Sequence, residues 1–357
     1  MKPLRSVEIA AAELSRISSL AATSPRQVLI NVTNMCNSRC TMCGIWKIYK
    51  DDRGPLASEM TLEEFRHFIR TNASLKDITL TGGEAYMRND ILEFFLTLSD
   101  AGYDTGVATN SLLPDRVKSV TLAVLDNMKN SRHHDLQVSI DGIGEMHDTV
   151  RGVPGNFSKA IELLKWGLSV AQHDPRLRVS VSHTITARSY RQLPDFVDTF
   201  VDMGIPPADI HFRPAQYAPS YYANRDGSFQ VTDIPGMAVA VQEVARRHPY
   251  YRDDLFVRGI LKFLANPTQM VIPCFASFTF CYIDPYWNVY PCITWLNSVG
   301  NLRDYGLDLA TFWRKEERLQ PVREQISRGH CPNCWTECMA GPTMNSDGVA
   351  ARILLRT

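Results

Sequence analysis

The sequence has 357 residues, 45% of them hydrophobic and 21% charged, so the chain can bury a substantial core and is not disordered throughout. Lys+Arg and Asp+Glu both number 38, and this balance removes the case for a broadly basic nucleic-acid binder. No apolar run approaches the roughly 18 residues of a membrane-spanning helix, and the N-terminus lacks the apolar stretch of a signal peptide. We therefore expect a cytoplasmic protein with no membrane and no nucleic-acid partner.

Residues 27–214 alternate between strand-like and helix-like stretches. Strand character occurs at 28–32, 78–80, 105–108, 136–140, 177–185 and 210–212, and helical periodicity at 61–71, 90–101, 114–128, 157–171 and 193–203. Thr61 and Glu64 have the spacing of a helix capping box. Six strands with intervening helices predict an α/β fold, a partial (βα)₆ barrel of parallel strands whose chemistry lies on loops at the C-terminal ends of the strands.

Three further regions flank this barrel. Residues 1–26 are expected to form a helical extension, and 215–272 a connecting helical region with a helix at 235–247. From 273 to 357 the sequence becomes rich in Cys, Pro and aromatic residues, with strand-like pieces at 282–285 and 288–290. We expect a small second domain there, a β-hairpin followed by a helix and a cysteine-bearing loop.

The nine cysteines fall into two groups with none between 44 and 273. An odd total without a secretory signal argues against a disulfide framework, and the tight spacings argue against scattered core cysteines. The front group is Cys36, Cys40 and Cys43. A structural zinc site needs four closed ligands, whereas three thiolates on a [4Fe–4S] cluster leave one iron open. The spacing therefore favours an iron–sulfur cluster over zinc.

The front group resembles the CxxxCxxC signature of the radical S-adenosylmethionine (radical SAM) superfamily. Further motifs follow in order at the strand ends: a GGE motif at 82–84, a TN pair at 109–110, an SxDG motif at 139–142 and an HDxxR segment at 147–151. The resemblance implies a SAM-chelating [4Fe–4S] cluster. It also implies that SAM is bound by Gly82, Gly83, Glu84, Asn110, Ser139, Asp141 and Arg151.

The rear cysteines resemble those of a twitch or SPASM auxiliary-cluster domain. Two fully Cys-ligated clusters would need eight cysteines and only six are present, so one auxiliary [4Fe–4S] cluster is expected. The resemblance assigns its ligands as Cys274, Cys292, Cys331 and Cys334. Cys281 and Cys338 could replace one of these or be packed thiols, and zinc at Cys331 and Cys334 is the competing hypothesis.

The resemblance implies reductive cleavage of SAM to a 5′-deoxyadenosyl radical, with electrons from an external reductant of the flavodoxin or ferredoxin type. An auxiliary cluster favours net oxidation, alcohol to ketone, and the short segment before the first strand favours a small-molecule substrate: a sugar, aminocyclitol or nucleoside in antibiotic, other natural-product or glycan biosynthesis. The alternatives are redox-neutral decarboxylation, epimerisation or deamination, and peptide or protein side-chain modification. Candidate catalytic residues near the strand ends are His183, His211, Arg213 and Tyr217.

Overall fold

The computed structural model describes residues 25–129, 132–272, 274–337, 340–341 and 344. The expected extension at 1–26 lies outside these residues except for its last two, and Cys338 lies outside them as well. Within the described part of the chain, every helix is too short or too polar to cross a membrane.

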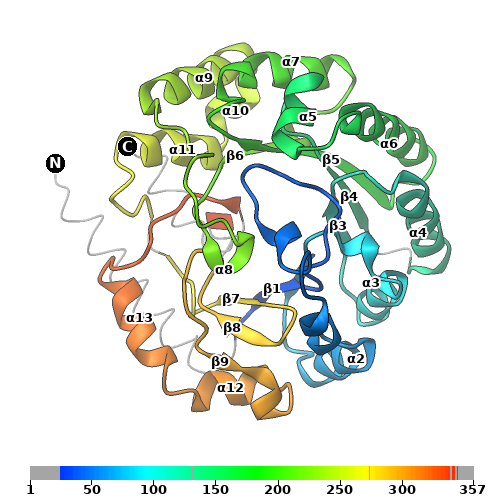
Figure 1. The fold of residues 1–357 in the computed structure, drawn as a ribbon, viewed down its shortest axis with the longest axis vertical. Helices are drawn as coiled ribbons and strands as arrows, with labels where there is room; N and C mark the ends of the chain where they lie inside the picture. Colours follow the sequence, from blue (N-terminus) through cyan, green and yellow to red (C-terminus); the bar gives the residue numbers. More distant parts are fainter. Residues whose placement is uncertain (1–24, 130–131, 273, 338–339, 342–343, 345–357) are drawn as a thin grey trace.

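Six parallel strands form the barrel, as the sequence predicts (Figure 1). β1 pairs with β2, and β3, β4, β5 and β6 pair in sequence order, all in parallel register. The strand bounds are β1 Gln27–Asn31, β2 Asp77–Thr81, β3 Thr105–Thr109, β4 His134–Ser139, β5 Leu177–Ile185 and β6 Ile210–Pro214. The predicted fold class is therefore confirmed.

The helices of the βα units surround the strands (Figure 1). They are α2 Leu62–Thr71, α3 Ile91–Asp100, α4 Pro114–Asn127, α6 Asn156–Ala171 and α7 Leu193–Asp202. Thr61 and Glu64 form the predicted capping box at the start of α2, each side chain bonding the other residue's backbone N–H. The helical pattern did not reveal α5, Glu145–Arg151, because one short helix of seven residues leaves little periodicity to detect.

The two faces of the barrel strands differ in burial, and the more buried face is the outer one. Alternate residues of β4 and β6 are fully buried under the helices, while the residues between them remain partly exposed to the barrel lumen. The inward residues are small or polar, such as Gln137 and Ser139 of β4 and Ser180 and Ser182 of β5. A barrel packed for stability fills its interior with bulky branched side chains. This barrel instead keeps a polar lumen, which leaves room for a ligand.

The C-terminal part of the chain continues the barrel sheet. β7 (Phe280–Ile283) pairs in parallel with β1, so that Val28 lies opposite Cys281, and β8 (Asn288–Tyr290) returns antiparallel to β7 as the predicted hairpin. β9 (Gly300–Asn301) completes a sheet ordered β2-β1-β7-β8-β9. Two helices follow, α12 Leu309–Lys315 and α13 Leu319–Ser327. The pairing of β7 with β1 was not predicted.

Four helices connect the barrel to this region: α8 Pro219–Tyr222, α9 Ile234–Arg247, α10 Pro249–Asp253 and α11 Leu255–Ala265. α11 packs against the cysteine-bearing segment at Gly259, where an added methyl group would overlap the ring of Trp335. Trp335 stacks on Phe256 and donates its indole N–H to the carbonyl of that residue at 2.7 Å. The absence of a side chain at Gly259 therefore leaves room for the ring of Trp335, the residue that follows Cys334.

Replacing Gly259 with Ala should displace Trp335 and lower the free energy of unfolding by about 1–3 kcal/mol, the usual cost of overpacking. The measurement is the midpoint of thermal unfolding. Gly227→Ala is the control, because its methyl group would meet only the flexible tip of Gln230. Equal midpoints for the two variants would contradict this packing argument.

Candidate active site

A cavity of about 460 Å³ occupies the barrel lumen. All three front cysteines line it, on the loop that follows β1. So do five of the seven residues that the resemblance assigns to SAM: Gly82, Gly83, Asn110, Ser139 and Arg151. Sequence-distant motifs therefore converge on one cavity, as parallel strands with a common end require.

The GGE turn clamps the cysteine loop through backbone contacts. The Gly83 N–H donates to the carbonyl of Thr33 at 2.7 Å, and the Glu84 N–H donates to the carbonyl of Met35 at 2.6 Å. A methyl group at Gly83 would overlap the Met35 carbonyl and crowd the Cβ atom of Cys36. Glycine is needed here because the two backbones touch.

The three front thiols influence one another electrostatically. Burial raises the pKa of Cys36 to about 12, with a further rise from the charge of Cys40. Burial likewise raises the pKa of Cys43, and the charges of Cys40 and Cys36 add to it. Three neighbouring sulfurs that repel as thiolates fit a group that brings compensating positive charge. Iron ions of a [4Fe–4S] cluster would supply that charge and hold the sulfurs as thiolates.

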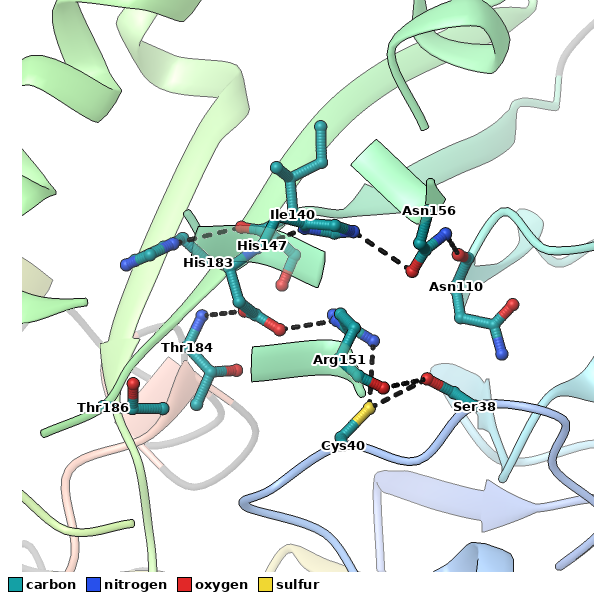
Figure 2. Close-up of polar contacts among 12 residues, drawn as sticks. Ser38, Cys40, Asn110, Ile140, His147, Arg151, Asn156, His183, Thr184 and Thr186 are labelled. Atoms are coloured by element: carbon teal, nitrogen blue, oxygen red, sulfur yellow. Dashed lines mark hydrogen bonds and ion pairs between the residues drawn. The ribbon is translucent and has the colours of Figure 1, made fainter. Parts of the chain in front are cut away.

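Arg151 connects the cysteine loop to the end of β4 (Figure 2). Its Nε atom lies 2.6 Å from Oδ2 of Asp141, and its Nη1 atom lies 3.7 Å from the sulfur of Cys40. Its carbonyl accepts hydrogen bonds from the Arg39 N–H and the Ser38 hydroxyl. Burial opposes the guanidinium charge, but the charge of Asp141 raises the pKa of Arg151. Arg151 is thus a fixed positive charge beside a cluster ligand.

His147 extends this arrangement to the neighbouring strand end. Its Nδ1 atom accepts the Asp141 N–H at 3.0 Å, so Nε2 carries the proton and donates to Oδ1 of Asn156 at 3.1 Å. The Asn156 amide then donates to the carbonyl of Asn110 at 2.9 Å (Figure 2). Burial lowers the pKa of His147 to about 4, which keeps the ring neutral in this role. The HDxxR segment therefore aligns two of the strand-end loops.

Two residues that the resemblance assigns to SAM do not line the cavity. Glu84 is buried, and its carboxylate accepts hydrogen bonds from the Asn110 N–H at 2.7 Å and the Thr109 hydroxyl at 3.1 Å. Asp141 pairs with Arg151 and accepts the Thr184 N–H at 2.6 Å. In this structure both carboxylates brace the strand-end loops, and their assignment to SAM stays a prediction.

His183 and Tyr217, two of the predicted catalytic residues, lie outside the lining of the cavity. His183 lies on the outer face of β5, bonded to the Ile140 carbonyl at 3.0 Å and packed on Phe196 of α7, and Figure 2 shows its ring directed away from Arg151. Tyr217 is 44% exposed and does not line the cavity. Tyr221 and Tyr222 of α8 line it instead. The sequence did not indicate that these two adjacent tyrosines lie on a short helix beside the cavity.

His211 and Arg213 do line the cavity, and both meet a partner that the sequence did not indicate. His211 Nδ1 lies 3.4 Å from Glu337, and Arg213 Nη1 lies 3.2 Å from it. Arg213 also donates to the Ser182 hydroxyl. Burial acts to raise the pKa of Glu337. The charges of Arg213 and His211 outweigh burial and hold this pKa below its ordinary value. The segment after Cys334 therefore enters the barrel, and Thr336 lines the cavity.

Four rear cysteines form a second mutually interacting group. Burial raises the pKa of Cys274 to about 12, and the charges of Cys292 and Cys331 add to the rise. Burial also raises the pKa of Cys334, and the charges of Cys292, Cys274 and Cys331 raise it further. In contrast, the pKa of Cys281 is raised by burial alone. This separation supports the predicted ligand set and supports a packing role for Cys281 in β7.

The eight cysteines within the described residues are all free of disulfide bonds. Across the same residues, no three His, Cys, Asp or Glu side chains converge closely enough to hold a single metal ion. A four-iron cube stands between its ligands and keeps them further apart than one ion does.

α8 contacts loops from both cysteine groups. The carbonyl of Tyr222 accepts the Gly44 N–H, beside Cys43, at 2.7 Å. The Ser220 hydroxyl bonds the carbonyls of Ile293 and Trp295, beside Cys292, at 3.2 and 2.6 Å. One four-residue helix thus contacts the loops that carry both groups.

Comparison with known proteins agrees with this site. Residues 30–187 match the family described as Radical SAM superfamily. An AdoMet-dependent heme synthase from Methanosarcina barkeri is 23% identical over 87% of this chain and 88% of its own. A PqqA peptide cyclase from Bradyrhizobium diazoefficiens is 23% identical over 92% and 86%, respectively. Streptococcus suis SuiB bound to precursor peptide SuiA has a TM-score of 0.63 at 16% identity, covering 95% of this chain and 79% of SuiB.

Residues 30–187 form a radical SAM domain, and the similar proteins are radical SAM enzymes of the SPASM or twitch type with a C-terminal extension. Its cofactors are accordingly SAM with a [4Fe–4S] cluster, together with an auxiliary cluster. These results confirm the resemblance and the cofactors that the sequence predicts.

Removing Arg151 alone should destabilise the protein by about 3–5 kcal/mol, since Arg151→Met leaves the Asp141 carboxylate buried and unpaired. The double variant Asp141→Asn, Arg151→Met should recover a large part of this loss because neither charge remains. Thermal unfolding midpoints of the reconstituted variants give the comparison. If the double variant loses as much stability as its two single substitutions together, the buried ion pair is not the cause of the loss.

The iron content of cysteine variants should distinguish the cluster ligands from the packed thiol of Cys281. The anaerobically reconstituted protein should hold about eight irons per chain, and Cys292→Ala or the triple Cys36→Ala, Cys40→Ala, Cys43→Ala variant should each hold about four. Cys281→Ala, the matched control, should keep about eight. Zinc in place of four of the irons, or equal loss in Cys281→Ala and Cys292→Ala, would overturn the ligand assignment.

Proposed function

We propose that this radical SAM enzyme oxidises a polar group of its substrate, alcohol to ketone, with the auxiliary cluster as electron acceptor. The observation that carries the proposal is the entry of Thr336 and Glu337 into the barrel directly after the cysteine pair 331 and 334. An acceptor held by those cysteines would stand beside the lumen in which the substrate radical forms. A redox-neutral rearrangement has no use for such an acceptor.

The cofactor bound at the front cysteines would supply a 5′-deoxyadenosyl radical for hydrogen-atom abstraction from the substrate carbon, and an auxiliary cluster held by the rear cysteines would take up the second electron. Loss of the hydroxyl proton would then need a base from this chain. Glu337 is ionised, because Arg213 and His211 lower its pKa, and so can accept that proton. Arg213 is placed to bind the substrate oxygen from the same side of the cavity.

The lumen favours a hydroxyl-bearing substrate. Its lining includes Thr79, Ser139, Ser180, Ser182, Thr184 and Thr336. Side-chain hydroxyls both donate and accept hydrogen bonds, which suits a sugar, aminocyclitol or nucleoside. We therefore retain a small polar metabolite as the first candidate substrate.

A peptide or protein side chain is the second candidate, favoured by two of the similar proteins. One is named a PqqA peptide cyclase, and SuiB is bound to a precursor peptide. A serine side chain would present the same alcohol to the same lumen.

The test is to incubate the reduced, reconstituted protein with SAM and separate panels of aminocyclitols, sugars, nucleosides and serine-containing peptides. A substrate should stimulate 5′-deoxyadenosine formation and yield a product lighter by two hydrogen atoms. A stimulated reaction whose product has unchanged mass, or has lost carbon dioxide or ammonia, would refute net oxidation.

With a substrate from that screen, Glu337→Gln should lower the oxidised product formed per 5′-deoxyadenosine about tenfold or more, because the proton has lost its acceptor. Glu337→Asp should restore part of the yield, and both variants should keep their iron. An unchanged product ratio in Glu337→Gln would exclude Glu337 as the base.

A further inference from the structure

The barrel cavity extends to the end of the barrel that lies opposite the cysteine loop. Its lining includes Asp77, the first residue of β2, Asp104, directly before β3, and Asp135, near the start of β4. The front cysteines and Gly82 line it beyond the other end of the strands. A five-residue strand such as β2 spans about 13 Å between its first and last Cα atoms. The lumen is therefore a passage that runs the length of the strands.

The strands begin with charged side chains at this far end. Because alternate residues of a strand share a face, the inward position at each strand start follows from the lumen residues two places later. The inward charged residues, on or directly before β2 to β6, are Asp77, Asp104, Asp135, Arg178 and Asp209. β1 and β7 begin with the uncharged Gln27 and Phe280. Four carboxylates against one guanidinium leave a surplus of three negative charges around this end of the lumen.

Arg178 does not neutralise this acidic ring. Its exposed guanidinium lies 3.5 Å from the carboxylate of Asp104 and 4.0 Å from that of Asp135, and such exposed pairs are weak. Burial raises the pKa of Asp135, and the charges of two neighbouring aspartates raise it further, although Arg178 and His133 act against them. Burial and the charge of Asp104 likewise raise the pKa of Asp77. The ring therefore has more negative charge than its protein neighbours compensate.

The lumen above the ring presents polar groups that the protein leaves unpaired. The side chains of Thr79, Gln137 and Ser180, each two residues after a member of the ring, form no hydrogen bond within the described residues. Thr336 lines the same cavity with only 2% of its surface exposed, and its buried hydroxyl also has no hydrogen-bond partner there. A buried polar group without a partner is rare in a folded protein and indicates a ligand or a water molecule that satisfies it.

A single metal ion does not explain the ring. Across the described residues, no three carboxylate, imidazole or thiol side chains converge closely enough to hold one ion. Neighbouring strands lie about 4.8 Å apart, so carboxylates that start successive strands are spread around the lumen. Cationic groups that are themselves separated, such as ammonium groups on different carbons of one small molecule, match this spread.

We propose that the lumen binds a substrate with ammonium groups as well as hydroxyls, an amino sugar or aminocyclitol, whose ammonium groups pair with Asp77, Asp104 and Asp135. Its hydroxyl-bearing end is then directed toward Arg213 and Glu337, near the other end of the strands. Charge-assisted hydrogen bonds to carboxylates are about twice as strong as neutral ones. The inference rests on the proposed function and selects amine-bearing molecules over neutral sugars and nucleosides.

The test measures equilibrium binding to the reconstituted protein with SAM but without reductant, so that no turnover occurs. The probes are 2-deoxystreptamine, neamine and glucosamine, with myo-inositol and glucose as their neutral counterparts, titrated by calorimetry. The ring variant is Asp104→Asn with Asp135→Asn, which keeps the shape of both side chains. The matched control, Asp115→Asn with Asp126→Asn, removes two exposed carboxylates of α4. Iron per chain and 5′-deoxyadenosine formed without substrate are measured for each protein.

At least one amine should bind the unaltered protein more tightly than its neutral counterpart, with an affinity that falls as salt rises. The ring variant should raise the Kd of that amine about tenfold or more. Asp104→Glu with Asp135→Glu should restore part of the affinity, and the α4 control should match the unaltered protein. The ring variant should keep its iron and its 5′-deoxyadenosine formation.

The inference is overturned if none of the three amines binds, if the neutral counterparts bind equally well, or if the ring variant loses iron. It is also overturned if the ring variant and the α4 control have the same Kd. Failure of the proposed oxidation is a separate result. An amine that binds through the ring but is converted to a product of unchanged mass would refute the oxidation and leave this inference in place.

Discussion

Parallel pairing of β1 with β7 is the constraint on which the rest of this structure depends. β1 leads directly into the front cysteine loop, and β7 begins the hairpin that leads to Cys292. A hydrogen-bonded ladder fixes both at one register, and a slip by one residue would turn every side chain of the strand to the opposite face of the sheet. The relative position of the two cysteine groups is therefore set by backbone hydrogen bonds, which side-chain changes elsewhere do not easily disturb.

The contacts of α8 and of Glu337 build on that framework from two sides. α8 joins the loops that follow Cys43 and Cys292, while Glu337 ties the segment after Cys334 to His211 and Arg213 of β6. The lumen thus has cofactor-bearing loops on more than one wall. The lumen is lined by polar side chains and therefore contains little hydrophobic packing. The hydrophobic core lies between the strands and the surrounding helices.

Buried charge is concentrated at the strand ends and is nearly everywhere compensated. Asp141 has Arg151 and a backbone N–H, and His147 is neutral with both ring nitrogens bonded. Glu84 accepts two backbone N–H groups and a hydroxyl, but burial still raises its pKa to about 7. Isolated charges at these depths would be costly, whereas a satisfied network is rigid. Rigidity there holds the three front thiols and the glycine turn in register.

The sequence alone determined the barrel, its strand order, the capping box, the terminal hairpin and the two cysteine groups. Those features are local: hydrophobic periodicity, turn residues and ligand spacing are visible in short windows of sequence. Only the tertiary structure decided that Glu84 and Asp141 brace loops, that His183 faces a helix, and that Glu337 reaches Arg213. Each of these depends on which way a side chain points, and for Glu84 and Glu337 also on a partner more than 25 residues away. No local pattern carries that information, because it arises when the strands are brought together.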